Sequence, residues 1–212
     1  MRGSNPILDI SNRSLILVGI IILTLSALSI LKFFIYALAF LLPTLYSTLL
    51  MIMGIFMMVS GISFYVYGKK YGGSLGMMCM ILIISVGIGY ILLGYFVAAY
   101  SVEPTELNYY GLGIALTIVK TALFFYCFLS IFLFFEARNG SIGGYGGLLI
   151  LFFSSTNFFY VFSIEFLRTI PGAIITSLSG IGYILQGIAL DRVFKPPRFK
   201  YPLPRRRPLK LF

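Results

Sequence analysis

Long, nearly unbroken apolar segments dominate the chain and determine the predicted fold. Cutting the sequence at its charges and Gly/Pro clusters leaves six segments: 15–42, 45–67, 75–98, 112–135, 148–164 and 173–190. Most match the roughly 20 residues that cross about 30 Å of hydrocarbon. Soluble helices and strands would show apolar stripes of period 3.6 or 2 instead. The pattern therefore predicts an all-α, polytopic bundle of about six transmembrane helices.

Two of these segments are irregular. The first is too long for one upright crossing and carries Lys32, so it is either strongly tilted or becomes interfacial over 33–42, before Pro43. We count it as one span. The fifth is short, and Glu165 and Arg168 near its end have the spacing of an i,i+3 ion pair.

Composition agrees with a membrane protein. Hydrophobic residues make up 59% of the 212 residues and charged residues 10%, and the mean hydropathy is +1.00. Soluble domains are only about half apolar. The formal net charge is +10, from 16 Lys and Arg against 6 Asp and Glu; in a soluble protein this would suggest a nucleic-acid partner. In a membrane protein the placement of the charges matters more.

The basic residues predict the orientation. Six spans put both termini on one side, which collects Arg2, Arg13, Lys69, Lys70, Arg138, Arg192, Lys195, Arg198, Lys200, Arg205, Arg206, Arg207 and Lys210. The other side holds Arg168 with three glutamates. Because positive residues resist translocation, we expect cytoplasmic termini in a plasma membrane or, for a virus or plasmid protein, a host membrane. The predicted regions are a cytoplasmic segment (1–13), a transmembrane domain (14–190) and a cytoplasmic tail (191–212).

Short sequence matches suggest an internal repeat. The stretch 87–94, Gly-Ile-Gly-Tyr-Ile-Leu-Leu-Gly, recurs at 180–187 with Gln for the second Leu, and 27–32 resembles 115–120. These matches pair span one with four and three with six. That arrangement is the 3+3 inverted repeat of many secondary transporters. Chance matching in a chain rich in Ile, Leu and Gly is the alternative.

Glycines seven residues apart mark helix faces for close packing. The pairs are Gly61 and Gly68, Gly87 and Gly94, and Gly180 and Gly187. Small residues on one face let helix backbones approach closely in a membrane. They predict a compact bundle of spans two, three and six.

The sequence lacks the residues of most catalytic and metal sites. There is no histidine, which excludes imidazole haem ligands, His-based zinc sites and Ser-His or Cys-His pairs. The two Asp residues, Asp9 and Asp191, lie at span ends, and the two Cys residues lie inside apolar segments, where we expect buried free thiols. We expect no enzyme, cofactor or metal site.

Seven methionines crowd into spans two and three. Met53 and Met57 resemble the Met-x-x-x-Met of copper-transporter spans, but the accessory glycine pattern of that family does not follow. We interpret these methionines as flexible gap-filling side chains.

Polar residues inside spans are the candidate site. Lys120 lies within the fourth span, where a charge costs a few kcal/mol and usually marks a pathway or partner. Ser154, Ser155, Thr156 and Asn157 follow one another in the fifth span, and Gln186, the only glutamine, lies in the sixth. We predict an intramembrane polar site formed by these six residues. The alternatives are snorkelling of Lys120 and ordinary interhelical hydrogen bonds.

The C-terminal tail is cationic and rich in proline. Proline prevents a helix there, so the tail is expected to run extended along a surface. Anionic lipid headgroups are the expected partner, and the contact residues are Arg198, Lys200, Arg205, Arg206 and Arg207. A protein partner is a weaker alternative, and nucleic acid is disfavoured.

Two classes of function remain from the sequence. The first is a small-solute or ion transporter or channel, which predicts polar groups converging inside the bundle. The second is a non-catalytic subunit of a membrane complex, with a membrane-protein partner or further copies of itself, which predicts a polar or Met-rich stripe facing lipid.

Overall fold

The computed structural model describes residues 6–31, 38–136, 140–159 and 170–194. In these ranges every regular element is a helix. The elements are α1 (Pro6–Leu31), α2 (Leu38–Tyr67), the short π-helix η1 (Gly68–Gly72), α3 (Ser74–Val102), α4 (Glu106–Glu136), α5 (Ser141–Phe159) and α7 (Ile170–Phe194). The all-helical prediction is confirmed for the described chain.

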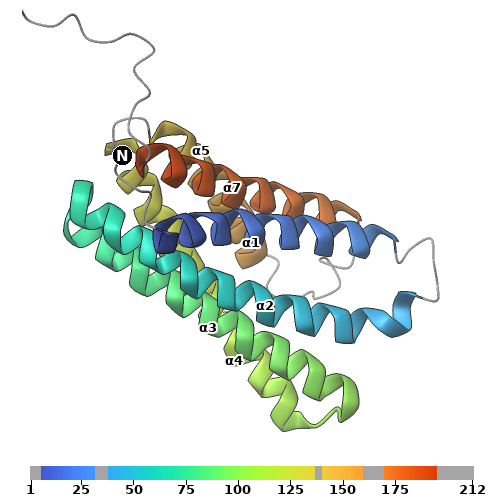
Figure 1. The fold of residues 1–212 in the computed structure, drawn as a ribbon. Coiled ribbons are helices and arrows are strands. Elements are labelled where there is room, and N and C mark those ends of the chain that lie inside the picture. The colour runs from blue at the N-terminus through green and yellow to red at the C-terminus, as the bar shows by residue number, and fades with distance from the viewer. Residues whose placement is uncertain (1–5, 32–37, 137–139, 160–169, 195–212) are drawn as a thin grey trace, which may run out of the picture.

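The long helices run roughly side by side in a bundle (Figure 1), and the contacts between them close a ring. Each packs against the next in chain order from α1 to α5, α5 packs against α7, and α7 closes the ring on α1. Neighbouring helices are antiparallel: Gly187 near the end of α7 adjoins Asn12 near the start of α1, whereas Gly180 adjoins Gly19. The start of α1 and the end of α7 therefore lie at the same end of the bundle, which we call the terminal end.

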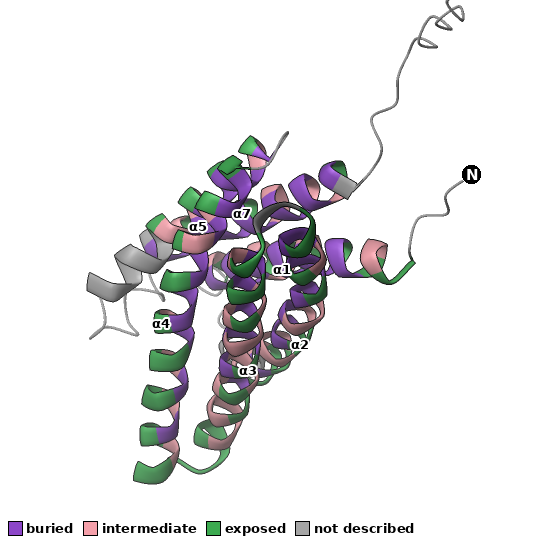
Figure 2. Cartoon of the chain, turned by 90° about the vertical axis from the view of Figure 1, so that its left-hand side faces the viewer, coloured by how far each residue is buried: buried purple, intermediate pink, exposed green. Residues whose placement is uncertain are grey.

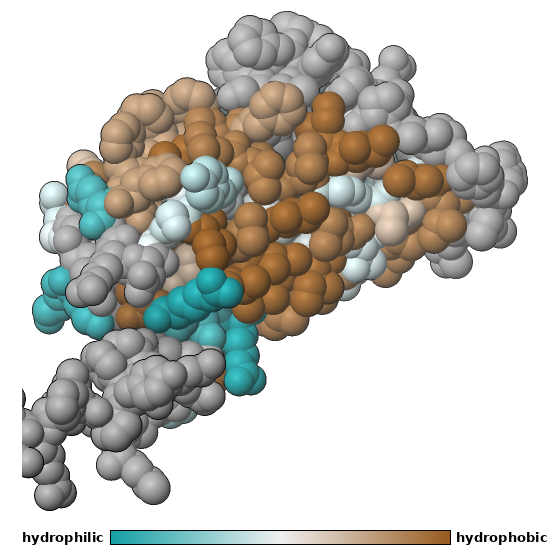
Figure 3. Space-filling view, turned by 90° about the horizontal axis from the view of Figure 1, so that it is seen from above, coloured by the Kyte–Doolittle hydropathy of each residue, from teal (hydrophilic) through white to brown (hydrophobic). Residues whose placement is uncertain are grey.

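Five of these helices are long and apolar enough to cross a membrane: α1, α2, α3, α4 and α7. The described part of α5 contributes a shorter apolar helix, Ser141–Phe152. Buried residues face the centre of the ring, and exposed residues, mostly large and apolar, face outward (Figure 2). Hydrophilic residues gather toward one end of the molecule, and hydrophobic residues cover its middle (Figure 3). This is the architecture of a helical membrane bundle.

The predicted extent of the first span, 15–42, is wrong, although the segment supplies one long apolar helix, as counted. α1 ends at Leu31, and α2 begins at Leu38 and contains Pro43. Pro43 is the sixth residue of α2, beyond the residues whose N–H groups lack an intrahelical acceptor, so it removes one backbone hydrogen bond of the helix and favours a bend there. α1 also begins at Pro6, so residues 6–13 are helical, and Ser11 and Asn12 are buried.

The glycines do form close helix contacts, but the predicted grouping of spans two, three and six is wrong. Gly87 and Gly94 face α2, whereas Gly180 and Gly187 face α1, and α7 packs on α1 and α5. A row of glycines provides a smooth face without specifying its partner. Gly87, the first glycine of one matching stretch, thus contacts the preceding helix, α2, whereas Gly180, the first glycine of the other, contacts α1. The inverted repeat stays a prediction.

Candidate functional site

A buried set of hydrogen bonds joins α4 to α7. The Tyr126 hydroxyl donates to Gln186 Oε1 at 2.6 Å, and Gln186 Nε2 donates to Ser130 Oγ at 3.0 Å. The Ser130 hydroxyl donates to the carbonyl of Cys127. All three side chains are fully buried. We call Tyr126, Ser130 and Gln186 the glutamine cluster.

Small residues on α5 make room for this cluster. A Cβ added at Gly147 would lie 3.2 Å from both Gln186 Nε2 and Ser130 Oγ, and one at Gly146 would lie 2.5 Å from the carbonyl oxygen of Gly182. α5 can therefore lie close to α7 and cover the Gln186 amide. The glycines hold the amide between three helices.

Tyr183 lies one turn before Gln186 on α7. It is 1% exposed, and its hydroxyl has no hydrogen-bond partner. Tyr183 and Gln186 are three residues apart and therefore lie on the same face of α7. The Tyr183 hydroxyl shares that face with the glutamine cluster and has unused donor and acceptor capacity.

A second buried polar group joins α1 to α2. The Ser63 hydroxyl lies 2.6 Å from Ser11 Oγ and 2.7 Å from Asn12 Oδ1, and Ser11 donates to the carbonyl of Val59. Asn12 Nδ2 is buried without a partner. We call Ser11, Asn12 and Ser63 the serine cluster. It adjoins α7, because a Cβ added at Gly187 would lie 3.1 Å from the Asn12 carbonyl oxygen.

Aromatic rings fill the space between α2 and α4. Phe64 packs edge-on against Tyr126 and Phe134, with ring centroids 5.4 and 5.9 Å apart. Tyr67 contacts Phe134 at 5.4 Å. These aromatic side chains are fully buried, so they fill the interior of the helix bundle near its terminal end.

Lys120 lies at the middle of α4 and is partly buried. It takes part in a hydrogen-bonding or electrostatic interaction. Glycines of α5 contact Ile131 and Phe134 of α4. At about 100° of rotation per residue, Lys120 points to the same side of α4 as these two residues. α5 therefore lies on the side of α4 that carries Lys120. Extending the antiparallel pairing of Ile131 with Gly147 places Lys120 at the depth of Phe158, within about one turn of 154–157.

The predicted site residues thus fall at two depths. Gln186 bonds to Tyr126 and Ser130. Lys120 lies about 9 Å farther from the terminal end than Tyr126, measured along α4. The backbone of Ser154, Ser155, Thr156 and Asn157 is helical in α5, but their side chains lie outside the described residues. The predicted headgroup contacts, Arg198, Lys200, Arg205, Arg206 and Arg207, also lie outside them.

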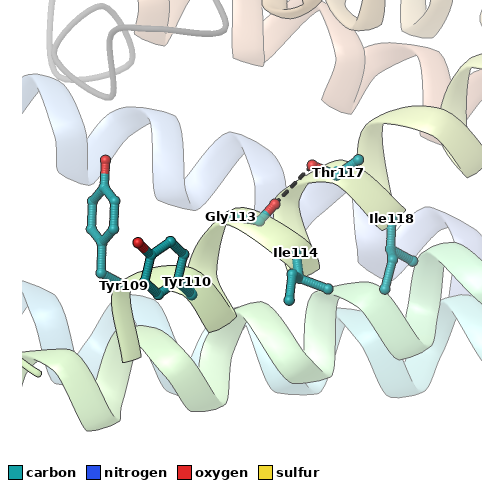
Figure 4. Close-up of a pocket in the computed structure, with 6 residues that line it drawn as sticks. All are labelled: Tyr109, Tyr110, Gly113, Ile114, Thr117 and Ile118. Atoms are coloured by element: carbon teal, nitrogen blue, oxygen red, sulfur yellow. Dashed lines mark hydrogen bonds between the residues drawn. The ribbon is translucent and has the colours of Figure 1, made fainter. Parts of the chain in front are cut away.

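Three hydroxyls on the outer surface bond within their own helices, as the buried Ser26 and Ser60 also do. Thr24, Thr48 and Thr117 are exposed, and each donates to the carbonyl four residues earlier in its own helix. Thr117 lines an open depression of about 350 Å³ on α4, together with Tyr109, Tyr110, Gly113, Ile114 and Ile118 (Figure 4). Its walls are mainly apolar, so this depression offers little to a polar ligand.

Sulfur does not gather into one site in the described chain. Cys79 and Cys127 are buried free thiols, as predicted. Met53 and Met57 are buried in the core, whereas Met77 and Met78 are each 52% exposed. Among the described residues no group of three or more Cys, Asp or Glu side chains is placed to hold a metal ion.

Sequence reasoning missed most members of the two clusters. Tyr126 and Tyr183 are two of fifteen tyrosines, and nothing local separates them from tyrosines at the interfaces. Asn12 lies beside Arg13, and the charge placed it in the N-terminal segment. One signal was available, because Ser60 and Ser63 interrupt an apolar run at i,i+3 spacing.

The helix ring, its apolar exterior and its buried polar contacts define a helical membrane protein. Comparisons with protein-family models, curated proteins and solved structures find no match.

Proposed function

We propose that this protein is a small-solute or ion transporter or channel whose route runs inside the helix ring. The supporting observation is the buried polar bonding between helices, which joins α4 to α7 in the glutamine cluster and α1 to α2 in the serine cluster. Intrahelical bonds satisfy the exposed Thr24, Thr48 and Thr117 and also buried serines such as Ser60, so they do not mark the route. Polar side chains are costly inside a membrane bundle, and they often mark a pathway.

Lys120 and the turn 154–157 form the mid-depth part of this route, and Gln186 lies nearer the terminal end. A positive charge at mid-depth favours anions over cations. The aromatic packing of Phe64, Tyr67 and Phe134 closes the route at the terminal end in this conformation. The basic tail orients that end toward the cytoplasm and binds anionic headgroups.

Flux into proteoliposomes tests the proposal. Vesicles are loaded for three assays: halide and nitrate uptake, potassium or sodium uptake, and osmotic entry of small polyols. We expect flux of one class, anions first, well above that of protein-free vesicles. Lys120→Leu and Gln186→Leu should each reduce it at least about tenfold, the effect of losing one well-placed group. Flux no greater than in protein-free vesicles in all three assays would overturn the proposal.

The matched control is Thr117→Val, which removes an exposed hydroxyl from the same helix. Its bond is to the Gly113 carbonyl, so flux should stay at the wild-type level. An equal loss in this variant would show that the effect of Lys120→Leu reports general damage to α4.

A non-catalytic subunit is the second candidate, and one observation favours it. The outer surface of the described part of α4 and α5 carries nine exposed aromatic residues: Tyr109, Tyr110, Phe124, Phe125, Phe128, Phe132, Phe135, Tyr145 and Phe152. Aromatic side chains are enriched at protein interfaces. Native mass spectrometry from mild detergent separates the two candidates, because a single monodisperse chain contradicts the subunit function and a fixed second protein supports it.

A further inference from the structure

We propose that the Tyr183 hydroxyl binds an internal water molecule that bridges it to the glutamine cluster. Tyr183 is one of two side chains in the described part of the chain with a buried polar atom that has no partner. A buried hydroxyl without a hydrogen bond costs about 1–3 kcal/mol, so native proteins rarely leave one unpaired. A water molecule is the smallest ligand that satisfies it.

The neighbouring groups meet the requirements of a bound water. Such a water makes about three hydrogen bonds to polar groups. Tyr183 offers a donor and an acceptor, and Gln186 Nε2 has a second N–H beyond the one given to Ser130. The Tyr126 oxygen, which donates to Gln186, still accepts. Donors and acceptors are therefore both present, in the balance that water needs.

The ligand is uncharged for a physical reason. The glutamine cluster consists of a phenol, a hydroxyl and an amide, which are neutral at physiological pH. Lys120 is about 9 Å along α4 from Tyr126. An ion held among neutral groups in a membrane interior would lack a compensating charge. The water site therefore lies nearer the terminal end of the proposed route than Lys120 and does not depend on its charge.

Occupancy by water does not depend on the proposed function, although a role in the route does. X-ray radiolysis of the full chain in lipid nanodiscs separates the two. Hydroxyl radicals formed from a bound water oxidise adjacent side chains even where bulk solvent does not reach. We expect oxidation of Tyr183 to exceed that of Tyr67 several-fold. Absence of flux in the wild-type protein, together with the expected oxidation of Tyr183, would overturn the transport function but not the water site.

Tyr67 is a stringent control. It is equally buried, it lies at the last position of α2 nearer the bundle end, and its hydroxyl already contacts the Leu133 carbonyl. Radicals from bulk water would reach it first. Tyr183 oxidised no more than Tyr67, while the exposed Tyr109 is oxidised normally, would overturn the water site.

Tyr183→Phe gives a second readout. Removing a hydroxyl that bonds to water lowers the melting temperature, whereas removing an unpaired one raises it. We expect a lower melting temperature and weaker oxidation of Tyr126 and Cys127. A higher melting temperature would overturn the water site.

Discussion

The glutamine and serine clusters lie on two sides of α7, and they are built differently. Gln186 reaches α4 and is covered by the glycines of α5, while the next residue, Gly187, lies against Asn12 on α1. Gln186 uses both ends of its amide between two helices, whereas Asn12 uses only its Oδ1. The comparison shows that the buried amide on one side of α7 is bonded through both its oxygen and its nitrogen, whereas the buried amide on the other side is bonded through its oxygen alone.

Glycine substitutions on the two sides of α7 should cause the largest combined loss of stability. In Gly146→Ala the new Cβ meets backbone, the Gly182 carbonyl oxygen at 2.5 Å, and we expect a loss of about 2 kcal/mol. In Gly187→Ala it meets Ile16 Cγ1 at 2.6 Å but comes no closer than 3.1 Å to backbone, at the Asn12 carbonyl oxygen, so the helices need to shift less and we expect a loss of about 1 kcal/mol. Thermal unfolding in detergent measures both changes.

Gly113→Ala is the control for both substitutions, since a Cβ there meets nothing within 4 Å. It should stabilise α4 by about 0.5 kcal/mol, the difference in helix propensity. Equal losses in Gly146→Ala and Gly187→Ala would show that the two seams are packed alike, against the comparison.

The amides should differ next. Gln186→Leu removes two hydrogen bonds and leaves the buried Tyr126 hydroxyl unpaired, so we expect a loss of about 2 kcal/mol. Asn12→Leu removes one bond and also an unpaired Nδ2, so its loss should be below about 1 kcal/mol. A greater loss for Asn12→Leu, measured by the same unfolding, would reverse the order of the clusters.

Two serines on α2 give the smallest expected difference. Ser63 bonds to α1, and Ser63→Ala should cost about 1 kcal/mol because Asn12 Oδ1 loses its donor. Ser60 is equally buried but bonds to the Met57 carbonyl of its own helix. Ser60→Ala should change stability by less than about 0.5 kcal/mol. If the two variants unfold at one temperature, interhelical bonding contributes nothing to the serine cluster.

The sequence predicts the class of fold because spans must be long and apolar, whatever their neighbours. It identifies Gln186 and Lys120 because a single amide or charge stands out in an apolar run. It does not identify Tyr126 or Tyr183, since their partners come from helix packing that no local pattern encodes. It also misplaces Asn12, because the adjacent Arg13 is exposed while Asn12 turns inward on the same helix.

The most direct test of the central claim is whether water reaches Lys120 from inside the ring. In a chain carrying Cys79→Ala and Cys127→Ala, Lys120→Cys is compared with Thr121→Cys, its exposed neighbour on the lipid side of α4. Both are treated in proteoliposomes with a charged, membrane-impermeant methanethiosulfonate reagent, which needs an aqueous thiolate. We predict modification at 120 and none at 121. No modification at 120, or equal modification at both positions, would contradict an aqueous route inside the bundle.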